Sequence, residues 1–231
     1  DRTVGGIELD RRLREILADA FNEKYPRKDI RADKKGMARL WKEAQRVKGI
    51  LSANSETTSQ VEGLAWDLDF KTKVTRATFE AACADLQKQF IQPLYDALLD
   101  AGLGFKEVSS IIMTGGASRT PMIQNAIKAA VPAEKLSFNV NADEAAVLGA
   151  ALHGAALSRQ FKTKNIKISD ILAHDVTVTY FVQPSSDFSR PRSITTTIFP
   201  KGSRVGTKKT MTMKRKDDMT LNFDYKKEPA P

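Results

Sequence analysis

Two separated groups of residues in this 231-residue sequence stand out by their types and spacing. The first is the segment IIMTGGASRTP at 111–121, in which an apolar strand runs into Gly115, Gly116 and then Arg119. A strand, a tight glycine turn and a helix start commonly hold a phosphate or a sugar edge. The segment matches neither GxGxxG nor GxxxxGK[ST], so spacing alone assigns no known nucleotide loop.

The second group lies on the polar face of an expected helix over residues 34–52. Gln45, Lys48 and Ser52 stand at i, i+3 and i+7, so they share one side of that helix. The opposite side is an apolar stripe of Leu40, Ala44, Val47 and Leu51. The polar side is consistent with a ligand-binding surface and equally with an ordinary solvent-exposed helix face.

Hydrophobic periodicity predicts the elements that position these two groups. In chain order they are a helix from Ile7, the helix over 34–52, hairpin strands over 57–66 and 67–74, a long helix capped by Thr75 or Thr78 that ends near Gly102, and a buried strand before Gly115.

Two further helix starts follow the glycine segment. Pro121 suits a first helical position, with Thr120 as its cap. Asn141 and Glu144 have the spacing of a capping box. The helix after them, EAAVLGAALHGAALS, is rich in Ala and Gly, which predicts backbone packed closely against a neighbour.

The sequence changes character after Phe161, where a charged connector precedes alternating, β-like segments. We expect an α/β domain over 1–160, a linker over 161–172 and an incomplete all-β sandwich over 173–231. Its expected strands are 176–182, 193–199, 208–214 and 220–225.

Composition excludes several classes of protein. With 28% charged and 41% hydrophobic residues, the chain is typical of a soluble globular protein, and no apolar run approaches the roughly 20 residues of a membrane span. The single cysteine, Cys83, forms no internal disulfide and is expected to be a buried thiol. His153 and His174 are far apart, so no metal site is expected. The chain lacks an initiator Met and a signal-like start, and we expect it to open within a protein.

The net charge of +9 raises the question of nucleic-acid binding. Acidic neighbours accompany most basic residues, which favours solvated helix faces. One alternative stays open, a basic tail that binds nucleic acid or an acidic membrane. It comprises Lys201, Arg204, Lys208, Lys209, Lys214, Arg215 and Lys216. It lacks interleaved aromatics and a known motif, so no nucleic-acid partner is expected.

Four segments together resemble one family. They are VGG at 4–6, QRVKGILS at 45–52, IIMTGGASRTP at 111–121 and NADEAAVLGAAL at 141–152. Their order and separations resemble the second lobe, subdomains IIA and IIB, of the nucleotide-binding domain of seventy-kilodalton heat-shock chaperones. This lobe belongs to the actin-like ATPase superfamily. A sugar or glycerol kinase with the same lobe is disfavoured by the β-rich tail.

The resemblance implies a role for each candidate residue. Gly115, Gly116 and Arg119 would form the adenosine wall, where glycines admit a close backbone and a guanidinium lies on adenine. The other roles are ribose and adenine contacts by Gln45, Lys48 and Ser52, a place near the phosphates for Gly6, and closure of the cleft from below by Asp143. No catalytic or metal-ligating residue is assigned.

The sequence departs from the family pattern at several positions. Gln45 replaces a usual glutamate, Gly49 an arginine, Ala117 a serine and Ala142 a proline. The change at Gly49 removes one of two guanidinium faces that sandwich adenine. Such contacts contribute roughly 0.5–2 kcal/mol, so nucleotide affinity should be altered without vanishing.

The resemblance also implies the cofactor. It is ATP or ADP, with magnesium in the full-length parent. The lobe with the first phosphate loop, its lysine and the magnesium-binding aspartates would precede Asp1. We therefore expect no ATP hydrolysis and at best weak nucleotide binding by the chain alone.

The connector and tail resemble a divergent branch of the family. FKTKNIKISDIL at 161–172 replaces the usual Asp-Leu-Leu-Leu linker, as in the 110-kilodalton cytosolic and 170-kilodalton endoplasmic-reticulum relatives. The tail over 200–225 is more similar to the lumenal group. This implies a nucleotide-exchange factor for a seventy-kilodalton lumenal chaperone and a holdase for unfolded polypeptides in the endoplasmic reticulum. The alternative is the cytosolic exchange factor.

Overall fold

The structure is a computed structural model that describes residues 4–158, 160–164, 168–182, 192–213 and 218–226. It divides into two compact units, 1–152 and 153–231, which are described separately. The domain limits proposed at 160 and 172 remain predictions. Some residues of the predicted connector, strand and basic tail lie outside the described ranges, namely Arg159, Ile166, Lys167, Lys214, Arg215 and Lys216.

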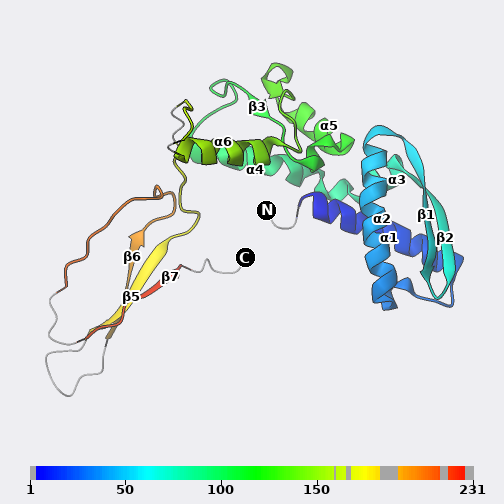
Figure 1. Ribbon diagram of the computed structural model, residues 1–231, viewed down its shortest axis with the longest axis horizontal. Helices are drawn as coiled ribbons and strands as arrows, with labels where there is room; N and C mark the ends of the chain where they lie inside the picture. Colours follow the sequence, from blue (N-terminus) through cyan, green and yellow to red (C-terminus); the bar gives the residue numbers. More distant parts are fainter. Residues whose placement is uncertain (1–3, 159, 165–167, 183–191, 214–217, 227–231) are drawn as a thin grey trace. The chain divides into compact units, whose positions relative to one another are not determined.

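Two long helices and a hairpin form the first part of unit one (Figure 1). The helices are α1 (Gly6–Lys24) and α2 (Lys34–Ala53), joined through the short 3-10 helix η1 (Ile30–Ala32). The strands β1 (Glu56–Ala65) and β2 (Leu68–Thr75) pair antiparallel. The predictions for both helices and for the hairpin are confirmed.

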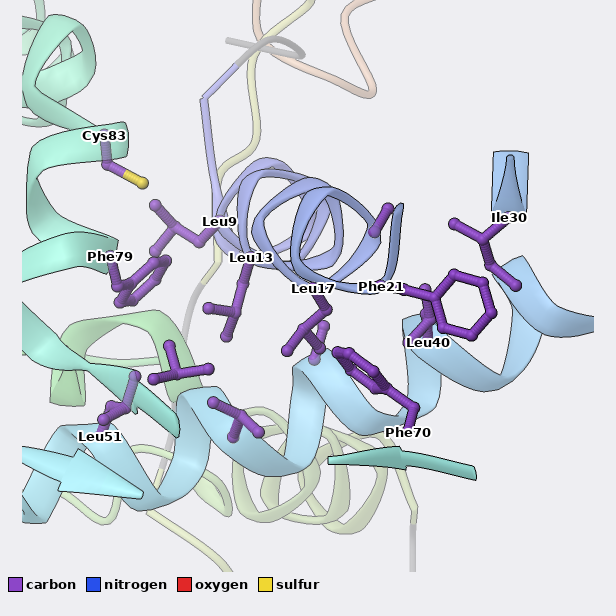
Figure 2. Close-up of a cluster of buried hydrophobic side chains, with 14 of the residues drawn as sticks. Leu9, Leu13, Leu17, Phe21, Ile30, Leu40, Leu51, Phe70, Phe79 and Cys83 are labelled. Atoms are coloured by element: carbon purple, nitrogen blue, oxygen red, sulfur yellow. The ribbon is translucent and has the colours of Figure 1, made fainter. Parts of the chain in front are cut away.

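The core of this part lies between α1, α2 and the hairpin. Leucines and a phenylalanine recur every fourth position along α1, so they lie on one face and point toward α2 (Figure 2). The fully buried side chains that meet there are Leu9, Leu13, Leu17, Phe21, Leu40, Val47, Phe70 and Phe79. This core fixes the position of α1 relative to α2.

An added side chain is expected to change the free energy of unfolding in opposite directions at two glycines of α2. A Cβ on buried Gly36 would lie 2.6 Å from Ile30 Cδ1 and 3.3 Å from Ala65 Cβ, whereas a Cβ on exposed Gly49 meets nothing within 4 Å. We expect Gly36→Val to lower the free energy of unfolding by about 1–3 kcal/mol through overpacking. Gly49→Ala, the control, should raise it by about 0.5–1 kcal/mol. Urea denaturation measures both, and equal signs would contradict the packing described.

The long helix predicted after Thr75 is wrong as a single element. The chain forms α3 (Arg76–Ala82), the 3-10 helix η2 (Ala84–Leu86) and α4 (Gln87–Ala101). The break falls at buried Cys83, beside Ala82, whose carbonyl accepts a hydrogen bond from Arg12 Nη1 at 2.8 Å. The Ala82 carbonyl at the end of α3 thus accepts a hydrogen bond from a side chain of α1. Thr75 does cap α3, and Gly102 ends α4 in the left-handed conformation at φ 65°.

Burial raises the pKa of the Cys83 thiol from 9.0 to about 11. The unfolded chain therefore loses this proton at lower pH than the folded chain does. The stability linked to Cys83 should be present in full below about pH 9 and be lost as pH rises toward 11. The measurement is the free energy of unfolding against pH. A Cys83→Ala variant isolates the thiol from other alkaline groups; identical slopes in both proteins would contradict a buried, neutral thiol.

The remainder of unit one contains the glycine segment. Strand β3 (Ile111–Ile112) pairs parallel with β4 (Leu136–Ser137), which follows the 3-10 helix η4 (Ala133–Lys135). The 3-10 helix η3 (Gly116–Arg119) leads into α5 (Pro121–Ala130). The expected strand before Gly115 exists, but its burial is wrong. Ile112 is 51% exposed, and its sheet consists of β3 and β4 within the described residues.

The predicted helix starts are correct in place and incomplete in their bonding. Thr120 is the N-cap of α5 with Pro121 after it, yet the Thr120 side chain makes no capping hydrogen bond. In a capping box the Asn141 side chain would accept from Glu144 N. Asn141 Oδ1 instead accepts from Asp143 N at 3.2 Å, and Glu144 N donates to the Asn141 carbonyl oxygen at 3.2 Å, so the capping box does not form. The helix that follows is α6 (Ala145–Leu157).

The close packing predicted for α6 is wrong. No residue of this helix is buried. The places for a Cβ on Gly149 and Gly154 both face open space. Its large apolar side chains, Val147, Leu148, Leu152 and Leu157, are 49–74% exposed, and no element within the described residues buries them.

Unit two contains a three-stranded antiparallel sheet in the order β6-β5-β7 (Figure 1). Its strands are β5 (Val176–Val182), β6 (Arg192–Phe199) and β7 (Asn222–Tyr225). The strand predicted at 208–214 is wrong over its described residues, 208–213, which form no strand. The described sheet has β6 and β7 as its edge strands, and residues 208–213 pair with neither of them. The described part forms a single sheet, and a sandwich is not observed.

Candidate functional site

The start of α1 is the point where the two predicted groups approach each other. Lys48 Nζ donates to the Gly6 carbonyl oxygen at 3.3 Å. The place for a Cβ on Gly6 lies 3.7 Å from Lys48 Nζ and 3.7 Å from Ala117 Cβ. The first turn of α1, the polar side of α2 and the 3-10 helix after the glycine turn therefore adjoin here.

An ion pair holds Lys48 in this position. Its ammonium lies 2.6 Å from Asp10 Oδ1, and Asp10 is only 4% exposed. That carboxylate oxygen has no aligned hydrogen-bond donor, so the charge of Lys48 is the contact that compensates its burial. The pair comes from α1 and α2, which share the core described above. The core thus sets where the ammonium stands.

The two other α2 candidates flank Lys48. Gln45 is exposed one turn before it. The Ser52 hydroxyl donates to the Lys48 carbonyl oxygen at 3.0 Å, a bond within the helix. Both side chains lie on the same polar side of α2 as predicted, and the described contacts tie neither of them to the glycine turn.

The glycine turn forms the second half of the candidate site. Gly115 has φ 83°, a conformation that favours glycine, and its N–H donates to the Ala142 carbonyl at 2.9 Å. Arg119 Nη2 lies 2.6 Å from Asp143 Oδ2, and the place for a Cβ on Gly116 lies 3.8 Å from Asp143 Oδ1. The turn therefore brings Asp143 to Gly115, Gly116 and Arg119, which lie more than 20 positions earlier in the sequence.

The Arg119–Asp143 pair remains accessible. The two side chains are 56% and 53% exposed, and ion pairs of this kind contribute at most about 1 kcal/mol. A cavity of about 340 Å³ adjoins Arg119 and is lined also by Ser118, Phe138 and Asn141. Of the eight predicted residues only Arg119 lines it, so this cavity is not by itself the predicted pocket.

Asp10 is the residue that sequence reasoning missed. It stands at i, i+3 and i+7 with Leu13 and Leu17, on the apolar side of α1. A carboxylate within an apolar stripe indicates a cation nearby, and this signal could have drawn attention to Asp10, although it does not identify Lys48 as the partner.

The chemical groups gathered here are of the types that bind an adenine nucleotide. It offers an ammonium beside a backbone carbonyl, a glycine turn without Cβ atoms, and a guanidinium that is more than half exposed. In the described part of the chain, His, Cys, Asp and Glu side chains form no group of three or more that could hold a metal ion. The helices of that part include none with the length and apolar character needed to cross a membrane.

Comparison with known proteins identifies the family to which the chain belongs. The profile of the family described as Hsp70 protein matches residues 1–228, so the chain belongs to the Hsp70 family. Hypoxia up-regulated protein 1 of Danio rerio is 47% identical over 181 residues, which are 78% of this chain and 18% of the relative. The human protein of that name is 44% identical over 183 residues, 78% of this chain and 18% of its own length.

A third relative agrees. Hypoxia up-regulated protein 1 of Gallus gallus is 42% identical over 187 residues, 81% of this chain and 19% of the relative. The resemblance to the divergent large branch of the superfamily is thereby confirmed. The chain spans less than a fifth of the length of these three relatives.

Proposed function

We propose that unit one forms one wall of the adenine-nucleotide site of an Hsp70-like molecular chaperone. The observation that carries the proposal is that Gly6 adjoins both predicted groups: its carbonyl oxygen accepts from Lys48 Nζ at 3.3 Å, and a Cβ placed on it would lie 3.7 Å from Ala117 Cβ. The ligand is ATP or ADP, with magnesium in the full-length parent. When bound, ATP supplies the phosphoanhydride whose cleavage drives the chaperone cycle.

Each residue of this wall has a defined task. Lys48, held by Asp10, presents its ammonium to the ribose and adenine, and Gln45 and Ser52 extend that face. Gly115 and Gly116 let the backbone approach the nucleotide. Arg119 lays its guanidinium on the adenine ring, oriented by Asp143.

Unit two is proposed to contact unfolded polypeptide. The register pairs Val178 with Phe223 and Tyr180 with Ile194, so these side chains share one face of the sheet. Phe223 is 62% exposed and Tyr225, two residues on, is 61% exposed. An apolar sheet face supports transient binding of extended, apolar client segments.

The parent protein is proposed to act as a nucleotide-exchange factor for a seventy-kilodalton chaperone and as a holdase in the endoplasmic-reticulum lumen. Support comes from the similarity to hypoxia up-regulated protein 1 and from the connector and tail sequences. The alternative is the cytosolic exchange factor of the same branch. Exchange of labelled ADP from a lumenal and from a cytosolic seventy-kilodalton chaperone, each mixed with the parent protein, distinguishes these two.

Nucleotide binding by the chain itself is testable with a fluorescent ADP analogue and competition by ADP. We expect Arg119→Ala to weaken binding about 2- to 30-fold, the effect of losing roughly 0.5–2 kcal/mol of guanidinium–aromatic contact. Lys106→Ala, at another exposed position, is the control and should bind as the parent chain does. Equal affinities for both variants, or binding that ADP does not displace, would refute the adenosine-wall role.

A further inference from the structure

The tip of the β1–β2 hairpin has an unfavourable backbone conformation. Residues Ala65 and Leu68 pair, and the two residues between them, Trp66 and Asp67, have φ of 51° and 58°. Such two-residue turns favour Asn-Gly, because side chains with a Cβ are strained there by roughly 1–2 kcal/mol per residue. A tryptophan in this place indicates that its side chain serves a purpose other than the turn.

The indole of Trp66 is held against the core. Its ring centroid lies 6.3 Å from that of Phe21, which is fully buried. Tyr25 packs on the same phenylalanine, at 4.9 Å between centroids. Trp66 is nevertheless 42% exposed. Two aromatic side chains are thus fixed at the surface by one buried ring, which limits the entropy that a ligand would have to overcome.

Three cations surround these rings. Lys28 Nζ lies 5.1 Å from the Trp66 ring centroid, and Lys24 Nζ lies 5.3 Å from that of Tyr25. Arg27, between the two lysines in sequence, is exposed. Among the ion pairs formed by the described residues, none includes these three side chains. Their charge is therefore available to an anionic partner.

A cavity of about 400 Å³ lies beside them. It is lined by Lys24, Tyr25, Pro26, Arg27, Lys28 and Leu68. Its size falls within the range of about 300–1,000 Å³ that is usual for binding pockets. Tyr25, Pro26 and Leu68 supply apolar surface, and the cations stand around it. We call these six residues together with Trp66 the Trp66 surface.

The Trp66 surface is distinct from the candidate nucleotide site. It lies at the last turn of α1, whereas Gly6 begins that helix. The 19 residues of α1 separate the two by about 27 Å at 1.5 Å per residue. A ligand of one would not contact the other.

We propose that the Trp66 surface binds an acidic segment of a partner protein that carries apolar anchor residues. Aspartate and glutamate side chains complement the unpaired cations, and a leucine or phenylalanine fills the apolar cavity. Tryptophan, tyrosine and arginine are the residues that dominate binding energy at protein interfaces. Nucleic acid is less suited, because Lys24 and Lys28 stand over the aromatic faces on which bases would stack.

A membrane also fits less well than a peptide. Interfacial binding to lipid requires a broad face of exposed apolar side chains. Of the Trp66 surface, the large hydrophobic side chain that is strongly exposed is Trp66 itself. The remaining apolar groups line a cavity, which is suited to single side chains.

The test uses the full chain and a fluorescein-labelled peptide of Glu and Asp with one Phe and one Leu, followed by fluorescence anisotropy. We expect Lys24→Glu/Arg27→Glu/Lys28→Glu to weaken binding at least about tenfold. Trp66→Asn should do the same, while its side chain tolerates positive φ and keeps the turn folded. Lys88→Glu/Lys106→Glu/Lys164→Glu changes the net charge equally at other exposed positions and should leave binding unchanged.

Three results would overturn the proposal. The first is no peptide binding, or equal losses in the two triple variants. The second is that a peptide of Glu and Asp alone binds as tightly as the peptide with Phe and Leu, which would show that charge accounts for the binding and that no apolar anchor is needed. The third is tighter binding of a single-stranded oligonucleotide or of anionic phospholipid vesicles that is lost in Trp66→Asn. None of these depends on nucleotide binding by the chain.

Discussion

A Lys48→Met variant is expected to unfold with a free energy about 3 kcal/mol below that of the parent chain. The substitution leaves the Asp10 carboxylate, 4% exposed, without its ion-pair partner at 2.6 Å. Removing one member of a buried pair destabilises by about 3–5 kcal/mol. The lower end applies because the Lys48 side chain itself is 20% exposed. Urea denaturation followed by circular dichroism measures the change.

The double variant Asp10→Leu/Lys48→Met provides the control. Replacing both charges by apolar groups removes the uncompensated carboxylate, so most of the lost stability should return. Both variants lack the ammonium and should bind the ADP analogue weakly, which separates stability from ligand contact. A Lys48→Met chain as stable as the parent would show that Asp10 is solvated and that the ion pair does not hold Lys48.

Phe21→Ala should be equally severe, lowering the free energy of unfolding by about 3–5 kcal/mol. Phe21 is fully buried and contacts three other aromatic rings, with centroids 4.9–6.3 Å away. Truncation leaves a cavity beneath the hairpin tip and removes the support of Trp66. Thermal unfolding by calorimetry measures the loss.

The matched control for this variant is Phe161→Ala. Phe161 is 63% exposed, so the same chemical change should alter stability by no more than about 0.5 kcal/mol. Similar melting temperatures for the two variants would contradict the assignment of Phe21 to the core.

The first two helices and the hairpin could be predicted because local pattern and tertiary packing agree there. Apolar residues at every third or fourth position in α1 and α2 coincide with the buried faces. The alternating segments on either side of the turn pair in antiparallel register, although Trp66, predicted to end a strand, lies in the turn itself. Where one stripe faces one core, periodicity is sufficient.

The failures have a common physical cause, which is the dependence of an element on its partner. The break at Cys83 follows from a hydrogen bond between Arg12 and the Ala82 carbonyl, 70 residues apart in sequence. Residues 208–213 alternate like a strand, yet they pair with no strand of the described sheet. The composition of α6 predicted burial, and no described element covers it. Pattern alone does not reveal whether a partner is available.

The candidate site was predicted from the order of four motifs and not from spacing within any of them. Gly6, Lys48 and the turn near Ala117 adjoin as that order implies. The contribution of Asp10 became visible only in three dimensions, because its partner is 38 positions away and on another helix. The nucleotide-binding role of these residues remains a prediction.

The measurement that tests the nucleotide wall most directly is the change in amide NMR signals of the isotope-labelled chain on addition of ADP. The account predicts shifts at Gly6, Lys48, Gly115 and Gly116, with little change at Trp66. Shifts confined to other residues, or none at millimolar ADP, would contradict the assignment of these groups to one purine pocket.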